Sequence, residues 1–243
     1  MQINPQKVKK QFEKSLDKYS ENAIVQKIMA EKLVKNLPEN SYSAILELGC
    51  GTGILTKEIA QKINFDRYIA NDLLIKAKKY ANLILPNSEF IVGNAQKISV
   101  GSKVDLVISN AMFQWLKKLD TAAEHFRTFL NPEGILAFST FSPKNFKEIK
   151  AVTGLSLEYK NKNELCEILQ PYFEIVSVEE FEKVLKFNSP LELLAHMKNT
   201  GVNSLNNDSW TFKDVKDFCK NFSEKYPENT LTYAPIIVIA KRK

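Results

Sequence analysis

The stretch AILELGCGTGILT, residues 44–56, places three glycines within five positions, although the chain of 243 residues contains only eight glycines. Its first half is almost wholly apolar, which is typical of a buried strand, and segment 52–63 has the apolar spacing of a helix. In open α/β sheets, ligands bind beyond the carboxyl ends of strands, where glycine lets the backbone pass close beneath a ligand. The stretch therefore predicts a strand, a ligand-binding turn and a helix whose first amides are free to donate.

Short apolar segments and helical patterns alternate around this turn. Segments typical of strands lie at 43–49, 67–72, 88–95, 103–111 and 131–141, and helical patterns lie at 52–63, 73–85 and 119–130. Strands that alternate with helices of about ten to fifteen residues favour a mostly parallel sheet covered by helices on both faces. The sequence therefore predicts an α/β fold.

The pattern changes toward both ends of the chain. Residues 5–37 read as two helices, a helix at 161–170 leads to a long strand candidate at 173–187, two amphipathic helices lie near 190–200 and 211–225, and a last strand covers 231–243. We interpret 1–243 as one domain with an amino-terminal helical segment at 1–40, a core at 41–187, a helical cap inserted at 188–228 and a final strand at 229–243.

The composition favours a protein of the cytoplasm with an anionic partner. The net charge is +6, yet only Arg67, Arg127 and Arg242 of the 34 basic residues are arginine. Because nucleic-acid readers exploit arginine, this scarcity counts against a DNA or RNA role. No apolar run approaches the roughly 18 residues of a membrane span, and none follows the charged amino terminus, so we expect neither a membrane segment nor a signal peptide.

The cysteines and histidines do not form a recognisable site. Cys50, Cys166 and Cys219 are odd in number and lack the spacing of metal ligands or redox motifs. His125 and His196 lie in helical patterns without a second ligand nearby. We expect reduced thiols and no metal.

The glycine turn does not fit the nucleotide motifs. The dinucleotide pattern requires glycine at its sixth position, where this chain has Ile54 or Thr56, and no Gly-Lys-Ser or Gly-Lys-Thr is present. The pattern formed by Glu47, Gly49, Gly51 and Gly53 resembles motif I of class I methyltransferases, which bind S-adenosylmethionine and release S-adenosylhomocysteine. That resemblance implies a Rossmann-like fold with a mostly parallel seven-stranded sheet.

The same resemblance assigns the other cofactor residues. Asp72 ends the second strand, where a carboxylate accepts hydrogen bonds from both ribose hydroxyls. Asn94 stands where the family usually has an aspartate for the adenine amino group, and its amide oxygen can accept the same bond. The expected set is completed by Leu73, Ala95, Asn110 and Tyr19, the last closing over the methionine end of the cofactor.

The segment SNAMFQW, residues 109–115, limits which methyl acceptors are expected. It lacks the Asn-Pro-Pro-Tyr motif of enzymes that methylate amino groups, which argues against methylation of nucleic bases. Methyl transfer is an in-line displacement in which positioning supplies most of the acceleration, and a base is needed only where the nucleophile must lose a proton. We find no base in the expected site loops and therefore assign no catalytic residue.

Five longer segments point to one family within the class I methyltransferases. Residues 8–26, 109–115, 138–150, 193–203 and 231–242 are similar to the malonyl-[acyl-carrier protein] O-methyltransferases of biotin synthesis. The resemblance implies methyl transfer to the free carboxylate of a malonyl thioester, giving an ester that primes pimeloyl synthesis. A carboxylate is ionised at neutral pH, which agrees with the missing base.

The resemblance also implies how the substrate is held. Gln114, Trp115 and Tyr233 are expected to line its pocket, and Lys198 to pair either with the substrate carboxylate or with the phosphopantetheine arm of the carrier. We expect a monomeric enzyme whose partner is an acidic acyl-carrier protein. Its contact surface would include the lysines of the amino terminus, Lys7, Lys9 and Lys10.

Three alternatives stay open at this point. A methyltransferase of another small carboxylic acid, of the trans-aconitate type, would share motif I. A non-catalytic binding protein with the same fold is disfavoured by the intact Glu47, glycine triplet and Asp72. A methyltransferase acting on RNA is disfavoured by the scarcity of arginine and by residues 109–115.

Overall fold

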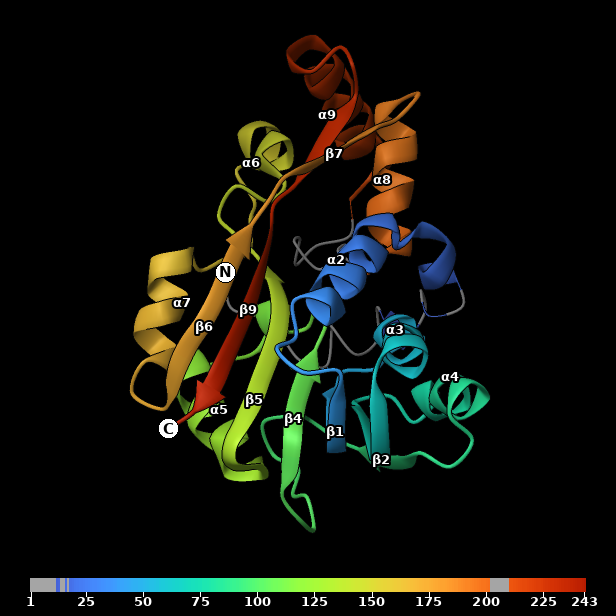
Figure 1. Cartoon of the computed structure of the whole chain (residues 1–243). Coiled ribbons are helices and arrows are strands. Elements are labelled where there is room, and N and C mark those ends of the chain that lie inside the picture. Colours follow the sequence, from blue (N-terminus) through green and yellow to red (C-terminus); the bar gives the residue numbers. More distant parts are fainter. Residues whose placement is uncertain (1–11, 14–15, 17, 202–209) are drawn as a thin grey trace.

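The computed structural model describes residues 12–13, 16, 18–201 and 210–243, and its centre is a seven-stranded sheet (Figure 1). The strand order is β3-β2-β1-β4-β5-β9-β6. The strands are β1 Ser41–Leu48, β2 Asn64–Asp72, β3 Glu89–Val92, β4 Val104–Ser109, β5 Leu130–Phe141, β6 Phe173–Glu180 and β9 Pro235–Arg242. Only β9 runs antiparallel to its neighbours, so the predicted mostly parallel sheet is confirmed.

Helices cover both faces of this sheet, as the alternating pattern predicted. They are α2 Ile24–Lys35, α3 Ile54–Lys62, α4 Ala77–Ile84, α5 Leu119–Phe129, α6 Lys147–Thr153, α7 Lys162–Leu169, α8 Pro190–Asn199 and α9 Phe212–Lys225, with a 3₁₀ turn at Phe113–Trp115. Residues of α2, α3 and α4 pack on one face, and residues of α5 and α7 pack on the other. Residues 12–13, 16 and 18–22 are also helical, whereas residues 5–11 of the predicted first helix lie outside the described part. None of the described helices is long and apolar enough to cross a bilayer.

The central strands form because parallel strands with both faces covered read as continuous apolar runs. The last five residues of β1 and all but one of β4 are buried. The single charged side chain in the buried part of β1 is Glu47, which is 1% exposed. A charge at such a position indicates a site, because burial of an ionised group is unfavourable unless partners compensate it.

The two long strands predicted near the carboxyl terminus are each interrupted. Segment 173–187 divides into β6 and β7 (Lys183–Lys186), and segment 231–243 divides into β8 (Thr230–Tyr233) and β9. Strands β7 and β8 form a separate antiparallel pair. The break lies at Ala234, whose N–H donates to Asn145 Oδ1 at 3.1 Å and whose carbonyl accepts from the Ser142 N–H at 2.8 Å. The next residue, Pro235, has no N–H to give to a ladder.

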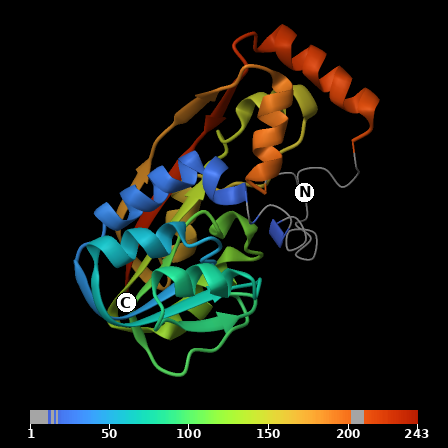
Figure 2. The same cartoon turned by 90° about the vertical axis from the view of Figure 1, so that its right-hand side faces the viewer.

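The two helices predicted between the last strands are present as α8 and α9. Both views show them beyond the carboxyl ends of β4 and β5 (Figures 1 and 2). Leu193 and Met197 of α8 and Phe222 of α9 share an apolar cluster with Tyr233 of β8 and Phe146. These helices therefore stand over the edge of the sheet at which a ligand is expected to bind. The division of the chain into a core and a cap stays a prediction.

Candidate functional site

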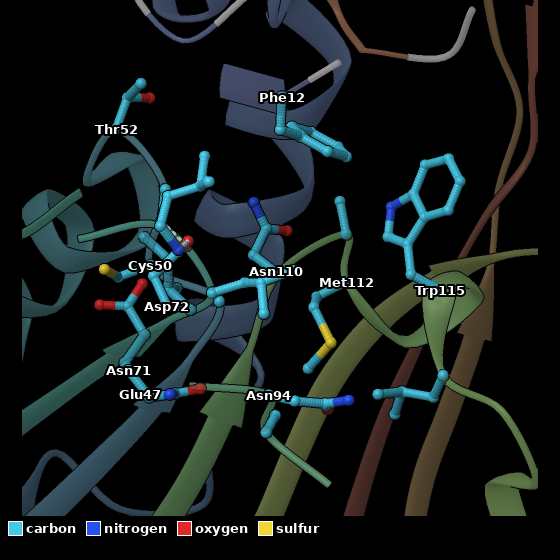
Figure 3. A pocket seen from close by; sticks show the side chains of 18 of the residues that line it. Phe12, Glu47, Cys50, Thr52, Asn71, Asp72, Asn94, Asn110, Met112 and Trp115 are labelled. Atoms are coloured by element: carbon cyan, nitrogen blue, oxygen red, sulfur yellow. Dashed lines mark hydrogen bonds between the residues drawn. The ribbon is translucent and has the colours of Figure 1, made fainter. Parts of the chain in front are cut away.

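A cavity of about 200 Å³ lies at the carboxyl ends of β1, β2, β3 and β4 (Figure 3). The strand order reverses between β1 and β4, which is where open α/β sheets bind ligands. The cavity brings together all the cofactor residues expected from the sequence except Gly53, which lies just behind the turn. Its lining also contains residues that the sequence did not single out, among them Phe12, Leu16, Thr52, Met112 and Leu116.

The three glycines of the turn serve different purposes. All have positive φ angles: +72° at Gly49, +52° at Gly51 and +79° at Gly53. A Cβ at Gly49 would lie 2.8 Å from Met112 Cγ, and one at Gly53 would lie 2.4 Å from Ile84 Cδ1. A Cβ at Gly51 would meet no protein atom within 4 Å. Gly51 therefore borders open space in the cavity, whereas the other two glycines permit close packing.

Asp72 is fixed at the end of β2 and 9% exposed. Its Oδ2 accepts from the Gly51 N–H and its Oδ1 from the Leu74 N–H, each at 2.8 Å. Burial raises the pKa of the carboxyl, and these backbone donors act in the opposite direction. Each oxygen keeps a second lone pair, so the carboxylate can accept two further hydrogen bonds from neighbouring hydroxyls.

Glu47 points from β1 toward the helix that follows it. Its Oε2 accepts from Thr56 Oγ1 at 2.6 Å and from the Tyr68 hydroxyl at 2.5 Å. Burial raises the pKa of Glu47 to about 7, against the effect of these two donors. These contacts join Thr56 of α3 to Tyr68 of β2. The carboxyl therefore stabilises the glycine turn before α3 and is not assigned to a methyl acceptor.

The end of β3 supplies Asn94 and Ala95 to the cavity, as expected. Asn94 Oδ1 accepts from the Gln96 N–H at 3.0 Å, which fixes the side chain in a local turn. The oxygen retains one lone pair and can still accept from an exocyclic amino group. Leu73 and Leu116 add apolar surface to the same cavity.

Asn110 joins three elements at the end of β4. Its Nδ2 donates to the Gln26 carbonyl of α2 at 2.9 Å, and its Oδ1 accepts from Ser139 Oγ of β5 at 2.6 Å. Ser139 Oγ also accepts from the Ala111 N–H at 2.9 Å. Both partners lie far away in sequence, and for that reason the residue types alone did not reveal them.

A 3₁₀ turn after β4 aims Trp115 at the cavity. Phe113 is buried and stacks on Phe138 at 3.8 Å between ring centroids, which anchors the turn. The Trp115 ring meets Phe12 edge-on at 5.7 Å. Its indole nitrogen faces the side of the cavity that holds Asn110 (Figure 3), and this buried atom has no hydrogen-bond partner among the described residues.

A second, smaller space of about 20 Å³ adjoins the cavity; we call it the inner chamber. It shares Phe12, Tyr19, Ala111 and Trp115 with the cavity, and its remaining lining residues are Gln26, Gln114, Phe141, Asn145, Phe146, Leu157, Tyr159, Thr200 and Tyr233. The structure thus brings together Gln114, Trp115 and Tyr233 from the expected substrate set.

Lys198 is not brought to either space. It is exposed on α8, whose buried side is formed by Leu193, His196 and Met197. His196, which the sequence did not assign to the site, instead contacts the Tyr233 hydroxyl through Nε2 at 2.7 Å. Lys7, Lys9 and Lys10 lie outside the described residues.

Comparison with known proteins identifies relatives along the whole chain. A family model described as a methyltransferase domain matches residues 46–138. A malonyl-[acyl-carrier protein] O-methyltransferase of Calditerrivibrio nitroreducens is 37% identical, covering 97% of this chain and 96% of the relative. A protein of the same description from Bacteroides thetaiotaomicron is 32% identical, covering 99% of each chain.

Solved structures show the same fold at low sequence identity. A methyltransferase structure from Bacillus halodurans has a TM-score of 0.64 at 15% identity, covering 87% of this chain and 97% of that one. The N-methyltransferase NodS of Bradyrhizobium japonicum, in complex with S-adenosylhomocysteine, has a TM-score of 0.55 at 14% identity, covering 89% and 85%. The seven-stranded sheet is therefore that of class I methyltransferases.

Gly51→Ala tests whether the open space over the turn is used by a ligand. An alanine in the left-handed region is strained by about 1–2 kcal/mol, so we expect a modest loss of stability. Gly154→Ala is the matched control, because Gly154 has φ +70° and equally open surroundings but lies outside the cavity. Calorimetric titration with S-adenosylmethionine should show weaker binding for Gly51→Ala alone; equal affinities would contradict the assignment.

Asp72→Asn tests the ribose assignment. An amide has one acceptor oxygen, and a hydrogen bond to a charged group contributes roughly 1.5–3 kcal/mol, so the dissociation constant for S-adenosylmethionine should rise about 10- to 100-fold. Asp105→Asn is the control, since Asp105 also accepts two hydrogen bonds, from the Ala44 N–H and Asn131 Nδ2, but lies outside the cavity. A similar loss in both variants would mean that Asp72 acts only through folding.

Glu47→Gln tests the cost of the buried carboxyl. A folded pKa near 7, above the ordinary value of 4.5, gives a stability contribution that is present below pH 4.5 and lost as pH rises through 7. Glutamine keeps an acceptor and does not titrate, so relative to wild type it should gain about 2 kcal/mol in unfolding free energy from pH 5 to pH 8. Urea unfolding at both pH values measures this, with Glu124→Gln on the exposed side of α5 as control. A difference that is independent of pH would refute it.

Proposed function

Because the chain belongs to the family of malonyl-[acyl-carrier protein] O-methyltransferases, we propose that it transfers a methyl group to the free carboxylate of a malonyl thioester on an acyl-carrier protein. It is an S-adenosylmethionine-dependent methyltransferase. The observation that carries the proposal is the inner chamber, which adjoins the cofactor cavity and gathers the expected substrate residues Gln114, Trp115 and Tyr233.

The cavity fits S-adenosylmethionine on two observations. Open space borders Gly51, where the backbone passes beneath the cavity, and the Asp72 carboxylate is fixed in the lining with free lone pairs. Asn94 and Ala95 would hold the adenine, and Tyr19, which also lines the cavity, would close over the methionine end of the cofactor. When bound, the cofactor supplies an activated methyl group on a positively charged sulfur.

The protein's own contribution is alignment of the acceptor and exclusion of water. The acceptor carboxylate is ionised at neutral pH and needs no base, so the chain has only to hold it in line with the methyl group. The two carboxyls of the cavity are engaged elsewhere, Glu47 with Thr56 and Tyr68 and Asp72 with backbone amides. Trp115 and Phe12, in edge-to-face contact, cover the space between cavity and chamber.

The methyl ester would remove the negative charge of the malonyl group, which an apolar chain-elongating enzyme would reject. The ester could then prime the pimeloyl chain used for biotin. The proposed partner is the acidic carrier protein, to which a net charge of +6 is complementary. Lys198 is exposed on α8 and does not line the chamber, which supports a contact with the carrier and not with the carboxylate. A free-acid substrate of the trans-aconitate type and a non-catalytic role are both disfavoured by membership of this family.

The proposal is tested by mass spectrometry of malonyl-acyl-carrier protein after incubation with the enzyme and S-adenosylmethionine. We expect a gain of one methyl group on this carrier, and none on a succinyl carrier or on free trans-aconitate. The Asp72→Asn variant at low cofactor concentration serves as a matched control and should lose most of the product. Methylation of the free acid alone would move the enzyme to another substrate class.

A further inference from the structure

The inner chamber is polar but uncharged. None of the described residues that line it is an aspartate, glutamate, lysine, arginine or histidine. Its polar groups are the hydroxyls of Tyr19, Tyr159, Thr200 and Tyr233, the amides of Gln26, Gln114 and Asn145, and the indole of Trp115. Gln114 Nε2, Asn145 Nδ2 and Thr200 Oγ1 already donate to protein acceptors, so the described lining offers an anion few free donors and no cation.

Trp115 supplies a donor that the protein leaves unused. Its Nε1 is buried and has no acceptor among the described residues. A buried polar group without a partner is unfavourable by about 1–3 kcal/mol, so in a native protein it is satisfied by a bound ligand or an ordered water. Indole nitrogen only donates, so the missing group is an acceptor.

The Tyr233 hydroxyl is a second candidate donor, and it contacts His196. The tyrosine is 1% exposed on β8, and its hydroxyl lies 2.7 Å from Nε2 of His196. Burial lowers the pKa of His196, which favours the neutral ring. A neutral ring with its proton on Nε2 donates to the phenol oxygen and leaves the hydroxyl proton free to point elsewhere.

We propose that the substrate carboxylate binds where the inner chamber meets the cofactor cavity. Its uncharged donors are Trp115 Nε1, which faces the cavity, and the Tyr233 hydroxyl of the chamber, with His196 as the positioning residue that directs the Tyr233 proton inward. The proposal rests on the proposed function, because it takes the malonyl group as the ligand. A chamber of about 20 Å³ holds roughly one water-sized group, which matches one oxygen of a carboxylate.

Uncharged donors suit this reaction better than a lysine or arginine would. Methyl transfer from a sulfonium to a carboxylate neutralises both charges, so the negative charge on the acceptor decreases in the transition state. A fixed cation would stabilise the ionised ground state more than the transition state and would slow the chemical step. Neutral donors orient the carboxylate and lose less stabilisation as its charge decreases.

The first experiment measures binding without turnover. Protein saturated with S-adenosylhomocysteine is titrated calorimetrically with malonyl-pantetheine and, separately, with its neutral methyl ester. We expect Trp115→Phe and Tyr233→Phe to weaken malonyl-pantetheine binding at least tenfold and to change binding of the ester less than twofold. Tyr226→Phe, outside the chamber, is the control and should bind as wild type does. Equal losses for both ligands would overturn the proposal, because they would reflect general packing.

The second experiment separates positioning from structure. His196→Leu should reproduce the loss seen in Tyr233→Phe, and the double variant should be no weaker than Tyr233→Phe alone, since both changes remove one interaction. His196→Gln keeps an N–H at similar reach and should restore most of the affinity. Additive losses, or no rescue by glutamine in a variant with wild-type thermal stability, would overturn the role of His196.

The third experiment introduces a cation into the uncharged chamber. Gln114→Lys places an ammonium group at the chamber, and we expect a lower KM for malonyl-pantetheine together with a lower kcat. An increase in kcat would overturn the argument for uncharged donors. Failure of the wild type to methylate any malonyl thioester, with tight binding of malonyl-pantetheine retained, would refute the proposed function and leave the carboxylate site supported. Methylation of a malonyl thioester by the wild type, with unchanged malonyl-pantetheine binding in all variants, would support the proposed function and overturn the carboxylate site.

Discussion

The hydrogen bond from the Gly51 N–H to Asp72 is the contact on which the cofactor side of the site depends. It ties the glycine turn after β1 to the end of β2, and the adjacent amides of Gly49 and Cys50 both donate to the Asn71 carbonyl at 2.9 Å. These bonds hold a turn that is unfavourable for residues other than glycine, because three of its five residues have positive φ. The same carboxylate that fixes the turn is left facing the cavity, so one residue both shapes the site and is available to a ligand.

The charges of the site are divided between its two compartments. The cavity is lined by Glu47, Asp72 and Lys117, whereas the described lining of the inner chamber contains no ionisable acid or base other than tyrosine. Carboxyls in the cofactor cavity are compatible with a positively charged sulfonium, and neither of them lines the inner chamber, where a substrate carboxylate would be repelled. An uncharged chamber then lets the attraction between substrate and cofactor decide where the acceptor lies.

What the sequence predicted well depends on short-range patterns. The strand, turn and helix around 44–56 are specified by consecutive residues, so the fold followed directly. Asp72 and Asn94 were assigned from the family resemblance by their place at strand ends, and both line the cavity. The break at Ala234 was missed because it depends on Asn145, 89 residues away. The contact between His196 and Tyr233 joins residues 37 apart and was missed for the same reason.

Lys198 shows that helical periodicity carries more information than a match of residue type. The buried positions of α8 and its end, Leu193, His196, Met197 and Thr200, follow spacings of three and four. Lys198 falls outside this stripe and is exposed, so the periodicity of its own helix places His196, not the lysine, toward Tyr233. The inner chamber thus receives Thr200 from the end of α8 and Tyr233 from β8, and tertiary contacts decide which polar residues face it. In the proposed reaction, in which charge is lost, this arrangement would keep Lys198 at the surface, where it can meet an acidic carrier, and would leave neutral donors at the reacting group.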